Sequence, residues 1–190
     1  MCHFISVIMP VDTSLSAAKA ILDKFHMAFL DVDNQFVEQQ FDGDRLFFLK
    51  GDNEDACHCG TVLGRDHPER LVGPRADTSV ADFRKLKKKG WSQSKIERAL
   101  SQKAQTTQRH EKERAQKYET EMQKWQEFLT ASLSETGFCK RLGLLLHFYS
   151  GSLSDEQFRI KRTERLPLSA KLESSLLTME DDVLYMISAR

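Results

Sequence analysis

Two stretches of the chain are almost entirely apolar, Phe4–Met9 and Leu142–Tyr149. Both are short and rich in β-branched or large aliphatic residues, which is typical of strands buried on both faces of a sheet. Pro10 ends the first stretch and Ser150-Gly151 ends the second. Four shorter stretches have the composition or alternation of strands, and we predict further strands at Phe36–Gln40, Leu46–Leu49, Gln157–Arg162 and Val183–Ile187.

Helical spacing begins after Ser14, which is a good N-cap residue. From there, apolar residues recur every three or four positions as far as Phe29, so we predict an amphipathic helix that packs on the sheet. Between the two β-type stretches that follow, Asp42-Gly43 predicts a hairpin turn. A second short helix is predicted at Leu168–Leu177.

The middle of the chain is helical in pattern. A capping box at Ser79–Asp82 opens a short helix that Gly90 closes. A second capping box at Ser94–Glu97 is followed by no Gly or Pro until Gly137, which permits one helix of about 40 residues, roughly 60 Å long. The centre, Gln105–Arg114, has almost nothing to bury, so a helical hairpin is the alternative to one continuous helix.

Strands before and after this helical segment predict an α+β fold, a mixed sheet with packed helices and a long helical insertion. The corresponding division is 1–77 for the first half of the sheet domain, 78–135 for the insertion and 136–190 for the second half. The apolar share of 40% suits a soluble globular chain, and no apolar run approaches the roughly 18 residues of a membrane span. The first residues lack the basic segment of a signal peptide, so we expect a cytoplasmic protein.

Cysteine and histidine cluster in two places, Cys2-His3 and Cys57-His58-Cys59-Gly60. Thiolate and imidazole ligands favour tetrahedral zinc, and the glycine gives the backbone room to turn around an ion. We therefore predict a structural zinc site formed by Cys2, His3, Cys57 and Cys59. His147 from the second buried strand is an alternative partner for Cys2, and a set of reduced thiols without metal is the simpler interpretation.

Cys2 also supports a different hypothesis. Removal of Met1 would give Cys2 a free α-amino group, which can act as the base for its own thiol. The Met-Cys start resembles that of class II glutamine amidotransferases and of proteins that crosslink abasic DNA sites, although His3 stands where those families have glycine. This resemblance implies an N-terminal-cysteine hydrolase or amidotransferase-like enzyme.

Charge is zero overall but unevenly distributed. Residues 31–55 include eight acids and two bases, whereas residues 82–117 include twelve bases and four acids. The basic run Arg84–Trp91 could meet phosphates and stack a base, which would make the chain a nucleic-acid-binding protein, but such runs are usually solvated helix faces. The acidic segment could present a DNA-like surface to a basic cleft, with partner-binding carboxylates at Asp42, Asp44, Asp52, Glu54 and Asp55.

The Met-Cys-His-Phe start, the Cys-x-Cys-Gly at 57–60, the charged helical centre and the Leu-Leu-Leu-His-Phe-Tyr strand are together similar to a group of small bacterial proteins. Some of these resemble immunity proteins encoded beside secreted antibacterial nucleases, for example effectors of type VI secretion. The resemblance implies a non-enzymatic protein that inhibits a toxin by covering its substrate cleft. Phe36, Phe41 and Phe47 are candidate aromatic anchors if they are exposed.

Overall fold

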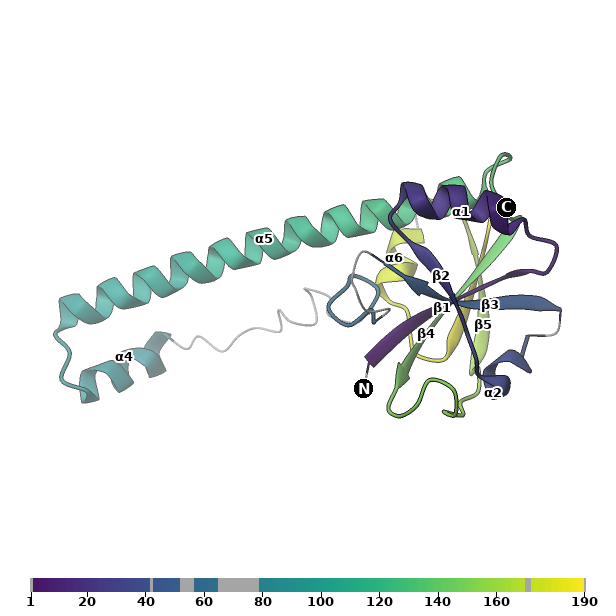
Figure 1. Ribbon diagram of the computed structural model, residues 1–190. Coiled ribbons are helices and arrows are strands. Elements are labelled where there is room, and N and C mark those ends of the chain that lie inside the picture. Colours follow the sequence, from purple (N-terminus) through teal and green to yellow (C-terminus); the bar gives the residue numbers. More distant parts are fainter. Residues whose placement is uncertain (1, 42, 52–56, 65–78, 170–171, 190) are drawn as a thin grey trace. The chain divides into compact units, whose positions relative to one another are not determined.

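The computed structural model describes residues 2–41, 43–51, 57–64, 79–169 and 172–189 (Figure 1). Its elements, in chain order, are β1 (Cys2–Pro10), α1 (Leu15–Lys24), β2 (Ala28–Asp31), α2 (Gln35–Glu38), β3 (Asp44–Lys50), α4 (Ser79–Lys88), α5 (Gln93–Leu133), β4 (Arg141–Tyr149), β5 (Arg162–Pro167), α6 (Leu172–Leu177) and β6 (Val183–Ser188). The predicted fold class is confirmed, because the strands form one mixed sheet with helices packed on it.

The sheet has the strand order β2-β3-β1-β4-β6-β5. Every neighbouring pair is antiparallel except β5 and β6, which run parallel. The first apolar stretch becomes a central strand, since β1 pairs with β3 on one side and with β4 on the other. Its residues Ile5, Val7, Ile8 and Met9 are completely buried, as continuous hydrophobicity predicts for a strand covered on both faces.

One face of the sheet is covered by α1 and the C-terminal part of α5 (Figure 1). The ring of Phe25, the residue after α1, meets that of Phe128 in α5 edge to face at 5.9 Å. The other face holds a core cluster that includes Ile8, Phe48 and Tyr149. Val37 of α2 belongs to the same cluster, and Phe158 packs against it. The sheet is therefore buried on both sides near β1.

The first helix begins as predicted, with the Ser14 side chain accepting a hydrogen bond from the Ala17 amide. Its end was predicted wrongly, because α1 stops at Lys24 and Phe29 lies in β2. His26 takes a left-handed conformation with φ of 51°, which breaks the helix and redirects the chain. The apolar spacing continues past this break only because Phe29 faces the same core from a strand.

The strand predicted at Phe36–Gln40 is also wrong, because the segment begins with the short helix α2. The buried Asn34 side chain accepts hydrogen bonds from the amides of Phe36 and Val37 and so caps a helix. The predicted two-strand hairpin around Asp42-Gly43 is therefore not formed, because the antiparallel neighbour of β3 is β2 and α2 lies in the connection between them. Gly43 has a φ of 75° just before β3, and Asp42 lies outside the described residues.

The late elements agree with the sequence pattern to different degrees. The strand Val183–Ile187 is confirmed as β6, whereas the helix predicted at Leu168–Leu177 is shorter, α6. The strand predicted at Gln157–Arg162 begins only at Arg162. Before it, the side chain of Gln40 donates to the Phe158 carbonyl and accepts from the Ile160 amide, so a glutamine side chain replaces the neighbouring strand for this segment.

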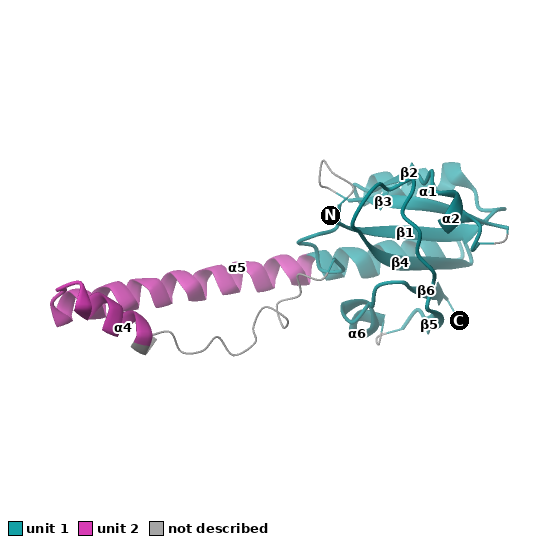
Figure 2. Ribbon diagram, turned by 90° about the horizontal axis from the view of Figure 1, so that it is seen from below, with its two compact units in different colours: residues 1–66, 121–190 teal, residues 67–120 magenta. Residues whose placement is uncertain are grey.

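The chain divides into two compact units, residues 1–66 with 121–190 and residues 67–120 (Figure 2). Unit 1 contains the sheet. In unit 2, α4 ends in a Schellman motif, as the sequence predicts, because Gly90 has a φ of 77° and the Trp91 amide bonds to the Leu86 carbonyl. The aspartate of the predicted capping box, Asp82, forms an ion pair with Lys103 of α5.

The predicted long helix is continuous, with 41 residues in α5. It begins at Gln93, so Ser94 lies inside it and not at its cap. Its polar centre is supported by pairs four residues apart, including Arg109 with Glu113 at 2.7 Å. Within the described residues, no helix combines the length and the apolar character needed to cross a membrane.

The continuity of α5 leads to a test at its polar centre. We expect Thr107→Pro to lower helical content and to cost about 3 kcal/mol or more locally, because proline removes a backbone hydrogen bond inside a helix. Circular dichroism and thermal unfolding measure both effects, with Thr107→Ala as the control for loss of the side chain. Equal helicity and equal melting temperature in the two variants would mean that residue 107 lies in a turn.

Candidate metal centre

The two cysteine-bearing segments meet at the start of the central strand. Cys2 opens β1, and Cys57 and Cys59 belong to a loop after β3. Their three sulfur atoms all lie within 4.8 Å of one another. Because a tetrahedral zinc ion with bonds of about 2.3 Å places its sulfur ligands about 3.8 Å apart, the three thiols are close enough to hold a metal ion.

Backbone hydrogen bonds hold this loop against β1. The His58 amide donates to the His3 carbonyl at 2.8 Å, and the His58 side chain is buried near Trp125 of α5. The loop then turns sharply at Gly60, which has a φ of 80°. A Cβ on Gly64 would lie 1.6 Å from the His58 carbonyl oxygen, so this position has no room for a side chain. The two glycines let the chain fold back around the thiols.

Two backbone amides point at sulfur atoms of the cluster. The His3 amide donates to Cys59 Sγ at 3.2 Å, and the Cys59 amide donates to Cys57 Sγ at 3.3 Å. Hydrogen bonds of this kind favour the thiolate form that a metal needs. Without an ion, burial and then the neighbouring Cys2 and Cys59 thiols raise the pKa of Cys57 to about 12, although the Cys59 amide lowers it. A bound cation would offset the repulsion between adjacent thiolates.

His3 lies beside this cluster but is not part of the three-thiol group. Its Nδ1 is 3.8 Å from Cys59 Sγ, and its Nε2 faces the Asp181 carboxylate at 3.6 Å. Metal-binding histidines commonly present their second nitrogen to a carboxylate in this way, which fixes the orientation of the ring. His3 is therefore oriented as a fourth ligand would be.

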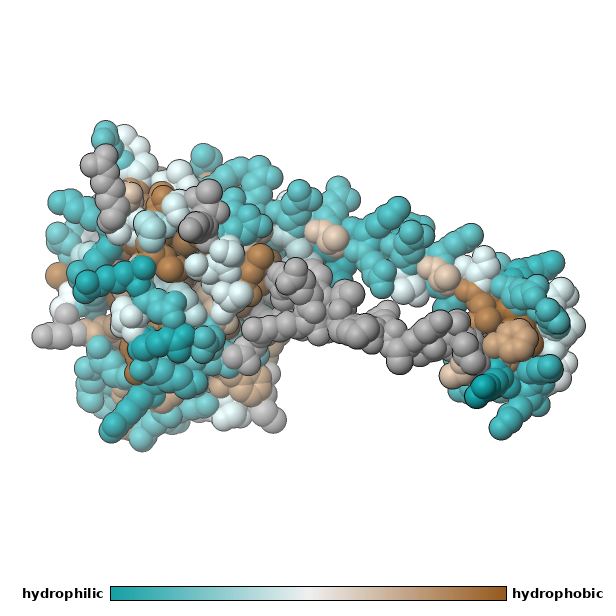
Figure 3. All heavy atoms as spheres, turned by 180° about the vertical axis from the view of Figure 1, so that it is seen from behind, coloured by the Kyte–Doolittle hydropathy of each residue, from teal (hydrophilic) through white to brown (hydrophobic). Residues whose placement is uncertain are grey.

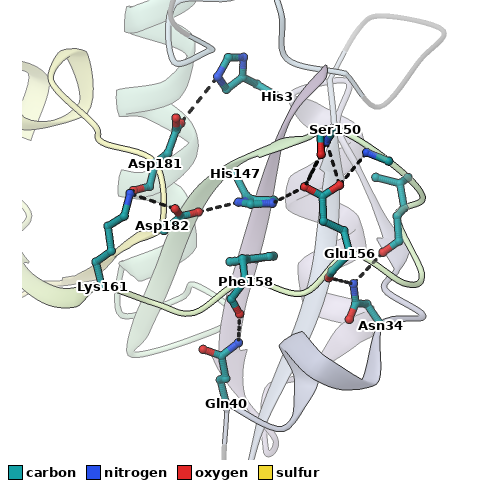
Figure 4. Close-up of polar contacts among 12 residues, drawn as sticks. His3, Asn34, Gln40, His147, Ser150, Glu156, Phe158, Lys161, Asp181 and Asp182 are labelled. Carbon is teal, nitrogen blue, oxygen red and sulfur yellow. Dashed lines mark hydrogen bonds and ion pairs between the residues drawn. The ribbon is translucent and has the colours of Figure 1, made fainter. Parts of the chain in front are cut away.

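His147, the alternative ligand, is held elsewhere (Figure 4). Its Nδ1 lies 2.5 Å from Asp182 Oδ1, its Nε2 lies 3.5 Å from Glu156 Oε1, and its ring stacks on Phe158 with centroids 3.6 Å apart. Lys161 completes the group through the second oxygen of Asp182 at 3.0 Å. Both ring nitrogens thus face carboxylates, and the pairing of Cys2 with His147 is not formed.

Asp182 connects two members of this polar group, because its carboxylate contacts both His147 and Lys161. Its φ of 64° is unusual for a non-glycine residue, and backbone bonds to Leu146 and Lys161 hold it there. No local sequence signal marks Asp182 or Glu156 as partners of His147, since the three come from different segments. The nearby Tyr149 side chain is almost fully buried, and burial together with these two carboxylates raises its pKa.

The predicted partner-binding carboxylates have different outcomes. Asp44 lies in β3, where its carboxylate accepts hydrogen bonds from Arg141 at 2.8 and 3.1 Å. Asp42, Asp52, Glu54 and Asp55 lie outside the described residues. The three candidate anchors Phe36, Phe41 and Phe47 are half-buried, with Phe41 against the core cluster and Phe47 stacked on Phe29.

The hypothesis of an N-terminal nucleophile depends on Met1, which also lies outside the described residues. It stays a prediction, while the Cys2 thiol lies in the three-thiol cluster. Comparison with models of known families, with curated proteins and with solved structures gives no match to this chain.

Glu156 provides a test of the polar group. Burial alone would raise its pKa, but hydrogen bonds from the Gly151 and Ser150 amides and the Ser150 hydroxyl lower it below the ordinary value of a glutamate. A lowered pKa contributes stability that is present above the ordinary value and is lost as pH falls through the folded value. We therefore expect Glu156→Gln to be less stable at pH 7 by about 1 to 3 kcal/mol and to approach the wild type as pH falls through the lowered pKa of Glu156.

Chemical denaturation at a series of pH values measures this difference. Glu135→Gln, at an exposed side chain, is the matched control and should follow the wild type throughout. If the loss of unfolding free energy in Glu156→Gln does not change with pH, the effect comes from altered packing or hydrogen bonding and not from the charge of Glu156.

Proposed function

We propose that the protein binds one structural zinc ion through Cys2, Cys57, Cys59 and His3. The observation that supports this is the mutual approach of three sulfur atoms within 4.8 Å, with the His3 Nδ1 3.8 Å from one of them. A donor set of three thiolates and one imidazole is a common composition of structural zinc sites. The amides directed at sulfur and the carboxylate behind His3 are the surroundings that such a set requires.

The ion would connect three parts of unit 1. Cys2 belongs to the central strand, and the loop that carries the other thiols continues into the buried residues Val62 and Leu63. The Val62 amide donates to the Glu121 carboxylate of α5 at 2.9 Å. A metal at the thiols therefore fixes a loop that touches both the sheet and the helix covering it, which is a structural role.

For the protein as a whole, we propose binding to another protein, as an inhibitor of a toxin enzyme. One supporting observation is a surface hollow at the edge of the sheet, whose charged lining residues are the acids Asp31, Glu38 and Asp44 and the base Arg45. Asp31, Asp33 and Glu38 are exposed, so this edge offers carboxylates to a basic partner. The resemblance to immunity proteins of antibacterial nucleases gives the class of partner, whose phosphate-binding cleft such a surface would complement.

The zinc proposal is tested by metal content. We expect about one zinc per wild-type chain by elemental analysis, and little zinc with marked destabilisation in Cys57→Ser, because structural zinc can supply on the order of 10 kcal/mol of folding free energy. Cys139→Ser is the matched control, since that thiol is half-buried in unit 1 and lies outside the three-thiol group. Zinc at background level in the wild type, or equal loss in both variants, would refute the site.

The inhibitor proposal is tested by association kinetics. After capture of the partner on the immobilised protein, we expect the triple variant Asp31→Lys, Asp33→Lys, Glu38→Lys to associate about tenfold more slowly at low salt, because opposite charges steer the encounter. The control reverses three exposed acids elsewhere, Glu127, Glu135 and Asp155, with the same change in net charge. Equal slowing in the two variants would show that net charge matters and that this edge is not the interface.

A further inference from the structure

Unit 2 carries a concentration of positive charge that its own carboxylates do not balance. Its described residues, 79–120, contain twelve bases and five acids. Five of the bases fall within six positions at the end of α4: Arg84, Lys85, Lys87, Lys88 and Lys89. All five side chains are exposed, and none has an ion-pair partner among the residues that the structure describes.

Four of these bases, Arg84, Lys85, Lys88 and Lys89, lie on one side of the helix, whereas Lys87, four residues after Phe83, lies beside the apolar side. Arg84 and Lys88 are four residues apart, as are Lys85 and Lys89, so the two pairs lie next to each other along α4. Phe83 and Leu86 lie on the opposite side and are half-buried. Like charges at this spacing repel one another, and an anionic ligand would relieve that repulsion.

The structure holds this basic helix in a defined place within unit 2. The Schellman turn at Gly90 joins α4 to α5, Ile96 is buried just beyond it, and Asp82 pairs with Lys103. Lys95 and Arg98 add two exposed bases from the first turns of α5. On the face drawn in Figure 3, most of the surface of α5 is hydrophilic.

The chemistry of this surface favours phosphates over bases or lipids. Lys95 Nζ lies 4.3 Å from the centre of the Trp91 ring, so a cation already occupies one face of this ring and at most the other face is left for stacking. An interfacial membrane helix needs an exposed apolar face opposite its charges. In α4 the residues on that side, Phe83 and Leu86, are half-buried.

We propose that the basic face of α4, with Lys95 and Arg98, binds the phosphate backbone of double-stranded DNA without reading its sequence. An α-helix fits the B-form major groove, about 12 Å wide, between two rows of phosphates. The major groove of duplex RNA is deep and narrow, and a helix cannot enter it in the same way. This function is separate from the zinc site, because none of its residues lies in the metal-bearing unit.

The test is fluorescence anisotropy of a labelled 20-base-pair DNA duplex with the full chain at 50 and 200 mM salt. With about five phosphate contacts, affinity should fall roughly 500-fold between these concentrations, because each contact releases condensed counterions. The variant Lys85→Gln, Lys87→Gln, Lys88→Gln should bind at least tenfold more weakly at 50 mM, with a correspondingly smaller salt dependence. A charge-reversed variant of the same three lysines to glutamate should not bind measurably.

The control neutralises three exposed bases of unit 1, Lys140→Gln, Arg159→Gln and Arg165→Gln, and should bind like the wild type. The α4 substitutions should leave the circular dichroism spectrum and the zinc content unchanged. These two measurements therefore distinguish the loss of DNA contacts from misfolding of the chain. Three results would overturn the proposal: no DNA binding by the wild type at 50 mM salt, equal weakening in the control, or tighter binding to duplex RNA or to anionic vesicles than to DNA.

Discussion

The central strand β1 is the element on which the rest of unit 1 depends. Its four fully buried residues, Ile5, Val7, Ile8 and Met9, face helices on one side and the core cluster on the other. Its two edges are paired to β3 and β4, which belong to distant parts of the chain. Strands from both halves of the sheet therefore meet on β1, and the thiol cluster lies where this strand begins.

Much of the sheet could be predicted from the sequence because burial on both faces leaves a continuous apolar run. Leu142, Leu144, Leu145 and Leu146 are completely buried in β4, as the run predicts. The long helix was also predictable, since it depends on local signals: a serine-rich start, no internal glycine or proline, and a glycine at 137. These elements could be predicted because their conformation depends mainly on residues close to one another in the sequence.

The errors occurred where a distant contact decided the conformation. Asn34 caps α2 while its amide donates to the carbonyls of Leu153 and Glu156, more than 100 residues away. Gln40 likewise satisfies the backbone around Phe158. Of the candidate site, the sequence showed that Cys2, Cys57 and Cys59 are metal-ligand residue types. Their approach to one another and the carboxylate of Asp181 behind His3 depend on the fold, and the Asp181 contact left no signal in the sequence.

The pairing of β1 with β4 also has a consequence for synthesis on the ribosome. Tyr149 pairs with Cys2, so the ribosome must add more than 130 residues before this edge of β1 receives its neighbour. Until then β1 can pair only with β3, and its second edge presents unpaired backbone groups beside some of the most hydrophobic residues of the chain. The nascent chain therefore passes through an interval in which it is open to intermolecular strand pairing, and α4 and α5, which lie between β3 and β4 in the sequence, lengthen that interval.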